Sequence, residues 1–186
     1  MKSQFRQDIL NRIKHLSAHD KAQASVSIET HLKQNLVNES GVWAGFQSLA
    51  GSEPQIDWSQ VSNKIEWAFP VASDNKLQFK KNVQNYSRQS LGFMEPQDGE
   101  TVTTEQIKGF VIPGVAFDRF GHRLGRGKGY YDQTLNKVNK KKIGVCFETA
   151  FCESVPYESH DLVCDQIITE KQIYHIHQVE GDRKWN

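Results

Sequence analysis

Apolar positions at the start of the chain recur with the spacing of an amphipathic helix. Over residues 2–16 these positions are Phe5, Ile9, Ile13 and Leu16, which places them on one helical face. Ser17 is followed three residues later by Asp20, a pattern that resembles a capping box with Asp in place of Glu. We therefore predict a second helix that begins after Ser17 and runs to about Val37.

Short apolar runs between turn-rich segments predict strands farther along the chain. We expect strands at 41–46, 67–71, 76–80, 109–118, 142–147, 165–169 and 173–176. The run 76–80 alternates apolar and polar residues, which suits an exposed edge strand. Residues 57–66 are expected to form a helix capped by Asp57 or Ser59, whereas the stretch 83–108 is polar and carries turn signals.

Alternation of strands with helices indicates the α/β class. We expect a single domain over residues 1–186, in three layers (α/β/α) around a largely parallel sheet. No internal repeat, low-complexity segment or long linker divides the chain. The polar segment 181–186, which contains Trp185, is expected to form a mobile tail.

Composition removes several classes of protein. The 186 residues suffice for one domain with a core, and a net charge of +1 gives no general attraction to nucleic acid or membranes. No apolar run approaches the roughly 18–20 residues of a membrane span, and the first six residues lack the apolar core of a signal peptide. The three cysteines contain no C-x-x-C pair, so we expect a cytoplasmic protein. The seven histidines, His175 and His177 included, suggest surface residues and no metal site.

The segment 121–132, with the sequence GHRLGRGKGYYD, is the most informative part of the chain. Its three alternating glycines allow positive φ and let a ligand approach the backbone, and successive N–H groups in such a turn can converge on an anion. Arg126 and Lys128, between the glycines, can add charge-assisted bonds to phosphate. A predicted strand precedes the segment and a predicted helix follows it, an order that suits phosphate binding.

Two widespread phosphate-loop patterns do not fit this segment. The P-loop requires Ser or Thr after its lysine, but Gly129 follows Lys128. The dinucleotide pattern requires a third glycine where this chain has Tyr130. A surface turn with solvated cations is the structural alternative.

With these residues in place, the chain resembles the 5-formyltetrahydrofolate cyclo-ligase family, also called 5,10-methenyltetrahydrofolate synthetases. The resemblance covers nearly the whole length and is strongest over 111–118 and 121–132. Weaker elements follow in the expected order: Lys2-x-x-x-Arg6, Glu53-Pro, GFMEP at 92–96, and HDLVCDQIITE at 160–170. The resemblance implies ATP-dependent cyclisation of 5-formyltetrahydrofolate, which can be polyglutamylated, to 5,10-methenyltetrahydrofolate, giving ADP and phosphate with Mg²⁺.

The resemblance also implies roles for individual residues. It places residues around the ATP phosphates, with Arg126 and Lys128 as catalytic cations that counter charge on the transferring group. The full ATP-binding set is Lys2, Arg6, Arg123, Leu124, Gly125, Arg126, Gly127, Lys128, Gly129, Tyr130 and Tyr131. Without the resemblance, Lys2 and Arg6 would be interpreted as two solvated cations on one helical face.

Acidic residues are matched to the metal and to folate. Asp132 and Asp165 match the Mg²⁺-binding acids, with Asp161 as the competitor of Asp165. Glu53 matches the acid that accepts the donor edge of the pterin, but Asp57 could take that role. Tyr130 is a further candidate for contact with the substrate.

Two other functions remain as alternatives at this stage. The chain could be a non-catalytic relative that binds folate or nucleotide, although such a binder has no need of a complete phosphate and magnesium apparatus. A nucleic-acid module built on the basic loop and its tyrosines is disfavoured by the low net charge. We expect an enzyme that acts as a monomer on small molecules, with no nucleic-acid or membrane partner.

Overall fold

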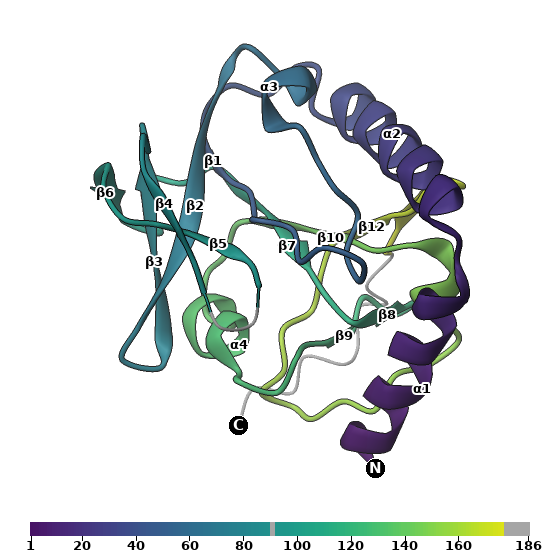
Figure 1. The fold of residues 1–186 in the computed structure, drawn as a ribbon. Helices are drawn as coiled ribbons and strands as arrows, with labels where there is room; N and C mark the ends of the chain where they lie inside the picture. Colours follow the sequence, from purple (N-terminus) through teal and green to yellow (C-terminus); the bar gives the residue numbers. More distant parts are fainter. Residues whose placement is uncertain (90–91, 177–186) are drawn as a thin grey trace.

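The computed structural model describes residues 1–89 and 92–176 (Figure 1). His177 and the predicted tail 181–186 lie outside the described residues. None of the helices in the described ranges is long and apolar enough to cross a membrane.

An eight-stranded sheet forms the centre of the molecule. From one edge to the other its strands are β13 (Ile173–His175), β12 (Gln166–Ile168), β10 (Lys141–Val145), β7 (Gly109–Pro113), β1 (Gly41–Ala44), β2 (Ile65–Ser73), β3 (Lys76–Lys81) and β6 (Glu100–Val102). The strands from β12 to β2 are mutually parallel. β13, β3 and β6 pair antiparallel to their neighbours. The prediction of a largely parallel sheet is confirmed.

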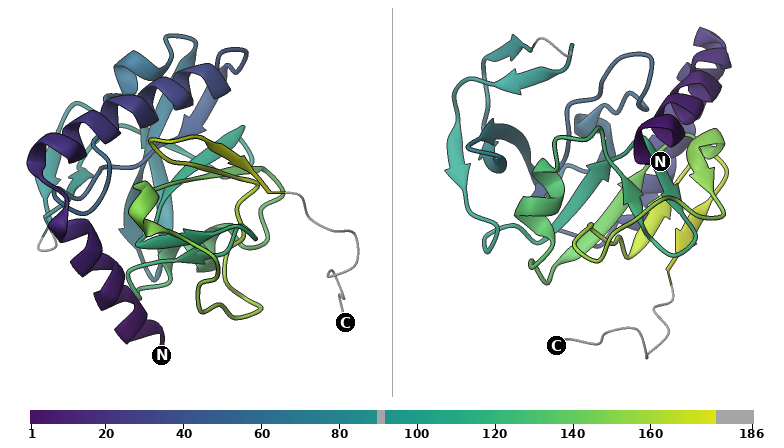
Figure 2. Two further views of the ribbon diagram at one scale, coloured as in Figure 1. Left: turned by 90° about the vertical axis from the view of Figure 1, so that its right-hand side faces the viewer. Right: turned by 90° about the horizontal axis from the view of Figure 1, so that it is seen from below.

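Helices cover both faces of this sheet, as Figures 1 and 2 show. α1 (Lys2–His15) and α2 (Ala18–Asn35) contribute to one apolar core, and α4 (Tyr130–Leu135) contributes to the other. Successive side chains of β7 point to opposite faces of the sheet and so into different cores. Val111 packs in the core of the N-terminal helices, whereas Phe110 and Ile112 pack in the core that contains Leu135. The three-layer prediction is therefore confirmed. Ser17 caps α2 by accepting a hydrogen bond from the Asp20 N–H at 3.0 Å.

The predicted strand at 109–118 is two strands in two different sheets. After β7 the chain turns at Gly114 and continues as β8 (Ala116–Asp118), which pairs with β9 (Arg123–Leu124) and β11 (Phe151–Cys152). A Cβ at Gly114 would lie 2.7 Å from the Phe117 ring, so this turn requires glycine. The break places β9, and with it the glycine-rich loop, on a small second sheet.

Three further predictions differ from the structure. The strand expected at the edge, β3, is flanked on both sides because the three-residue β6 pairs with it. The helix expected over 57–66 is one turn, α3 (Trp58–Val61), because residues 65–66 already belong to β2. The stretch 83–108 contains β6 and a hairpin of β4 (Tyr86–Arg88) and β5 (Met94–Pro96).

Gly144 in β10 gives a test of the packing between the sheets. A Cβ at this position would lie 2.5 Å from the Phe117 ring and 2.7 Å from Ile167 Cδ1. We expect Gly144→Ala to lower the free energy of unfolding by about 1–3 kcal/mol, because overpacking forces neighbours to shift. Urea unfolding measures this change. Val26→Ala, at a position 65% exposed on α2, is the control and should change stability by less than about 0.5 kcal/mol. Equal stability of the two variants would contradict the packing described.

Candidate functional site

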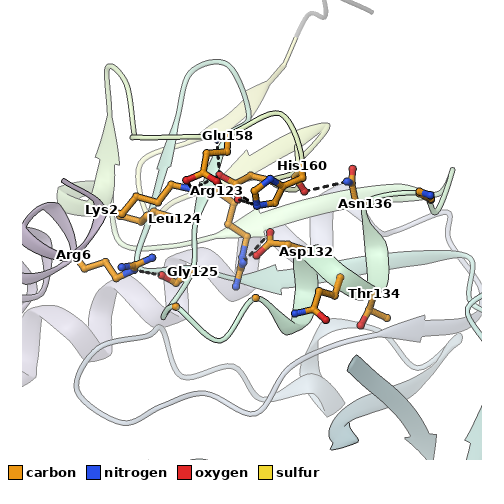
Figure 3. A pocket seen from close by; sticks show the side chains of 15 residues that line it. Lys2, Arg6, Arg123, Leu124, Gly125, Asp132, Thr134, Asn136, Glu158 and His160 are labelled. Carbon is orange, nitrogen blue, oxygen red and sulfur yellow. Dashed lines mark hydrogen bonds and ion pairs between the residues drawn. The ribbon is translucent and has the colours of Figure 1, made fainter. Parts of the chain in front are cut away.

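A pocket of about 450 Å³ opens where four segments meet (Figure 3). These segments are the start of α1, the loop between β9 and α4, α4 itself, and the stretch 158–161. Lys2 and Arg6 reach it from α1, while Asp132 reaches it from α4. The fold thus brings the N-terminal helix and residues 158–161 together at the glycine-rich loop.

The glycine-rich loop takes backbone conformations that favour glycine. Gly127 has φ +100° and Gly129 has φ +69°, and Gly129 immediately precedes α4. Arg6 Nε donates a hydrogen bond of 2.7 Å to the Gly125 carbonyl, which ties α1 to the loop. A Cβ at Gly127 would lie 3.8 Å from the Arg6 guanidinium carbon. The loop therefore presents backbone and a cation to the pocket with few side chains between them.

Arg123 is a buried cation at the base of the pocket. Its Nε donates a 2.8 Å hydrogen bond to the Pro113 carbonyl, and its guanidinium lies 4.9 Å from the centre of the Tyr131 ring. Its Nη1 is 3.7 Å from Asp132 Oδ1. A Cβ at Gly125 would lie 2.7 Å from the same Nη1. Arg123 thus fixes the loop, α4 and Asp132 relative to one another.

Lys2 lies between two acids that line the same pocket. Its Nζ is 2.7 Å from Asp161 Oδ2 and 3.0 Å from Glu158 Oε1. Burial opposes the charged form of Lys2, but the hydrogen bonds to both acids raise its pKa above the ordinary value. Burial likewise acts to raise the pKa of Asp161, but the bonds from Lys2 and from the Glu158 N–H lower it. Lys2 and Asp161 are therefore a charged pair near neutral pH.

Asp132 and Asp161 are brought together by a direct backbone contact. Asp132 Oδ1 accepts a 3.1 Å hydrogen bond from the N–H of Leu162, the residue after Asp161. Both acids line the pocket. Asp165 does not: it is exposed at the start of β12, where its Oδ2 accepts a 2.8 Å hydrogen bond from the Lys142 N–H. The structure thus gathers Asp132 and the competitor Asp161, and leaves Asp165 outside.

The described residues contain no group of three or more His, Cys, Asp or Glu side chains placed to hold a metal. The carboxylates of Asp132, Glu158 and Asp161 nevertheless line the pocket, and Mg²⁺ is often bound by one or two carboxylates with phosphate and water. Asp132 and Asp161 therefore suit an ion that arrives with a phosphate ligand better than a closed structural site.

A second part of the site is an ion pair between Glu53 and Arg126. Glu53 is 7% exposed, and its Oε1 accepts hydrogen bonds of 3.1 Å from both Nε and Nη2 of Arg126. Nη2 also donates to Ser52 Oγ at 2.7 Å. The other carboxylate oxygen, Oε2, accepts a 2.9 Å bond from the Leu49 N–H. The acid matched to folate and an arginine matched to phosphate are thus partners of each other.

The remaining predicted residues take different positions. Lys128 is exposed and makes no hydrogen bond or ion pair with the described residues. Leu124 is buried and lines the pocket, and Tyr130 is half-buried at the start of α4. Burial raises the pKa of Tyr131, with Arg123 opposing and Glu53 reinforcing the rise.

Asp57 is already engaged in local structure. It is exposed, and its Oδ1 caps α3 by accepting from Ser59 N–H at 3.1 Å and from Ser59 Oγ at 2.6 Å. Of the two acids proposed for the pterin, only Glu53 is buried and paired with a residue of the loop.

Sequence reasoning did not single out several residues that line the pocket. Glu158 pairs with Lys2, and the His160 carbonyl accepts a 3.0 Å hydrogen bond from Asn136 Nδ2 (Figure 3). His160 and Asp161 open the segment 160–170 that carried part of the resemblance, so that segment was the available signal. Nothing in the sequence marked Asn136.

Comparison with known proteins gives one consistent result. Residues 1–170 match the sequence model of the 5-formyltetrahydrofolate cyclo-ligase family. A 5-formyltetrahydrofolate cyclo-ligase of Escherichia coli is 33% identical over 166 residues, covering 82% of this chain and 88% of the relative. The Mus musculus protein of the same name is 23% identical over 189 residues, with 89% and 92% covered. The solved structure of Aquifex aeolicus 5,10-methenyltetrahydrofolate synthetase superposes with a TM-score of 0.80 at 27% identity, over 100% of this chain and 99% of that one.

Proposed function

The chain belongs to the 5-formyltetrahydrofolate cyclo-ligase family, and from this premise we propose that it cyclises 5-formyltetrahydrofolate to 5,10-methenyltetrahydrofolate in a reaction that consumes ATP and requires Mg²⁺. Ligase chemistry in folate one-carbon metabolism follows from the family. The co-substrate, the metal and the intermediate are the parts that we propose. We further propose that the enzyme acts as a monomer.

The chemistry explains why ATP is needed. The formyl group on N5 is an amide, so its carbon is a poor electrophile and its oxygen a poor leaving group. Transfer of the γ-phosphoryl group of ATP to that oxygen forms an O–P bond and releases ADP. N10 then attacks the activated carbon and loses its proton to solvent, and the C–O bond breaks with departure of phosphate. Such a reaction depends mainly on positioning and on countering negative charge.

One observation carries the proposal: the pocket combines cations, a glycine-rich loop and acids. Lys2, Arg6 and Arg123 line it together with Gly125, Gly127 and Gly129. Cations and loop N–H groups suit a polyphosphate. Lys128 does not line the pocket itself, but it lies on the same loop, between two glycines that do, and its side chain is exposed. We assign Lys128 and Arg126 to the charge that develops on the transferring phosphoryl group.

Asp132 and Asp161 fit the magnesium ion that such a reaction uses. When bound, the ion would neutralise phosphate charge and help to align the transferring group. The two carboxylates line the same pocket as the cations, and Asp161 is already held by Lys2 and the Glu158 N–H. We therefore propose Asp161, in place of Asp165, as the partner of Asp132.

Exchange of each acid for its amide separates these two assignments. We expect Asp161→Asn to raise the Mg²⁺ concentration needed for half-maximal rate by about tenfold or more, because a carboxylate is a stronger ligand than an amide for a hard cation. Asp165→Asn is the matched control, since an amide oxygen can still accept the bond from the Lys142 N–H. Titration of the steady-state rate with MgCl₂ measures both. The reverse ranking of the two variants would restore Asp165 to the metal site.

The overall activity has a direct test. Purified protein mixed with 5-formyltetrahydrofolate, ATP and MgCl₂ should produce the near-ultraviolet absorbance of the methenyl product, with one phosphate released per product. Omission of ATP or of Mg²⁺ should abolish the signal. A flat trace from protein that still binds both ligands would support the alternative, a folate- and nucleotide-binding relative without catalysis.

A further inference from the structure

We propose that the ion pair of Glu53 and Arg126 is a latch that folate opens, and that its opening delivers Arg126 to the phosphate site. This inference rests on the proposed function, because it assumes folate at Glu53 and nucleotide in the pocket. The latch further implies that binding of either substrate increases the affinity for the other. The latch consists of Glu53, Arg126 and Ser52, whose hydroxyl oxygen also accepts a hydrogen bond from the Arg126 guanidinium.

Arg126 occupies acceptor sites on Glu53 that folate would need. A carboxylate offers about four acceptor sites, two on each oxygen. Arg126 uses Oε1 twice, through Nε and Nη2, and Leu49 N–H uses Oε2 once. A pterin edge with two parallel N–H donors needs one free site on each oxygen. Folate therefore cannot form both bonds until Arg126 leaves Oε1.

Because Glu53 is buried, it needs a hydrogen-bonding partner both before and after folate binds. Glu53 is 7% exposed, and a buried charge that loses its partner is strongly unfavourable. The N–H donors of the pterin can replace Arg126 without leaving the carboxylate unpaired. Before folate arrives, the same requirement keeps Arg126 at Glu53. The cost of leaving Glu53 unpaired thus keeps the latch closed in the free enzyme, and the latch opens only when folate supplies replacement donors.

Arg126 is the partner that can move. Its side chain is 31% exposed, whereas Glu53 is held by the Leu49 N–H from its own loop. Arg126 lies between Gly125 and Gly127, and both glycines line the pocket while Arg126 itself does not. Gly127 has φ +100°, a conformation from which glycine rotates at little steric cost. Release from Glu53 therefore leaves the guanidinium at the rim of the pocket, where its fork of donors matches phosphate.

A static role for Arg126 gives the opposite expectation. If Arg126 served only to orient Glu53, loss of the ion pair would not alter the phosphate site. If it is a latch, loss of the carboxylate charge weakens the hold on the guanidinium and makes it available for nucleotide in the absence of folate. Nucleotide affinity measured without folate therefore separates the two roles. If Arg126 only orients Glu53, this affinity should not change when Glu53 is replaced.

The test measures binding of the non-hydrolysable analogue adenylyl-imidodiphosphate, with Mg²⁺, by isothermal titration calorimetry. Wild-type protein should bind it about 5- to 20-fold more tightly when 5-formyltetrahydrofolate is present, a range typical of coupled sites. Glu53→Gln should bind it more tightly than wild type without folate and should show no further gain with folate. Glu153→Gln, at an exposed acid that pairs with Arg119 and not with Arg126, is the control and should behave as wild type.

Two results would overturn the latch. One is unchanged or weaker nucleotide affinity of folded Glu53→Gln in the absence of folate. The other is equal nucleotide affinity of wild type with and without folate, which needs no variant. Failure of the proposed function is a separate outcome, because it would show as wild-type protein that forms no methenyl product.

Discussion

Lys128→Ala is expected to lower kcat by about 100- to 1,000-fold while the fold survives. Loss of one donor to the charge that develops on the transferring group typically lowers a rate by this much. Lys128 is exposed and has no hydrogen bond or ion pair with the described residues, so its removal should cost little stability. The measurement is the steady-state rate of methenyl formation, beside the thermal unfolding transition of the same preparation.

Two further variants serve as controls for Lys128→Ala. Lys128→Arg keeps the charge and should recover part of kcat, although the two cations differ in geometry. Lys33→Ala, an exposed position on α2, should leave kcat unchanged. Loss of the folded state in Lys128→Ala would show a structural lysine, and an unaltered kcat would remove Lys128 from the chemistry.

Glu53→Gln should weaken binding of 5-formyltetrahydrofolate by about 100-fold. A hydrogen bond to a charged group contributes roughly 1.5–3 kcal/mol, and about 1.4 kcal/mol corresponds to a factor of ten. The amide retains one acceptor oxygen, but its NH₂ group meets the second N–H of the pterin donor to donor. Binding measured with folate alone reports this loss.

Asp57→Asn decides between the two acids considered for the pterin. Asp57 is exposed and caps α3, so its amide variant should bind folate as wild type does. If Asp57→Asn lost more folate affinity than Glu53→Gln, the pterin would belong at Asp57. The latch proposed above would then lose its basis as well.

Local sequence patterns predicted the parts of the fold that depend on neighbouring residues. The spacing of Ile9 and Ile13 predicted α1, and both residues are buried in the core beneath it. The apolar runs predicted the parallel strands, and Ser17 predicted the start of α2. The glycine-rich segment also lies at the pocket that its composition suggested.

Contacts between distant segments could not be predicted in this way. β6 has only three residues and no pattern of its own, so the inner position of β3 depends on a pairing that the sequence does not mark. The contact between Glu53 and Arg126 joins residues 73 positions apart. Asp161 and Asp165 are equally plausible ligands by spacing. The bond from Leu162 N–H to Asp132, which requires the folded chain, sets them apart.

We propose that the γ-phosphoryl group of ATP is transferred to the formyl oxygen of the substrate in this pocket. The most direct test of this proposal uses 5-formyltetrahydrofolate labelled with ¹⁸O in the formyl group, together with unlabelled ATP, MgCl₂ and wild-type protein. Mass spectrometry of the released inorganic phosphate is the measurement. We predict that each phosphate carries one ¹⁸O atom, because the oxygen that accepts the phosphoryl group departs with it. Methenyl product accompanied by unlabelled phosphate would contradict the account.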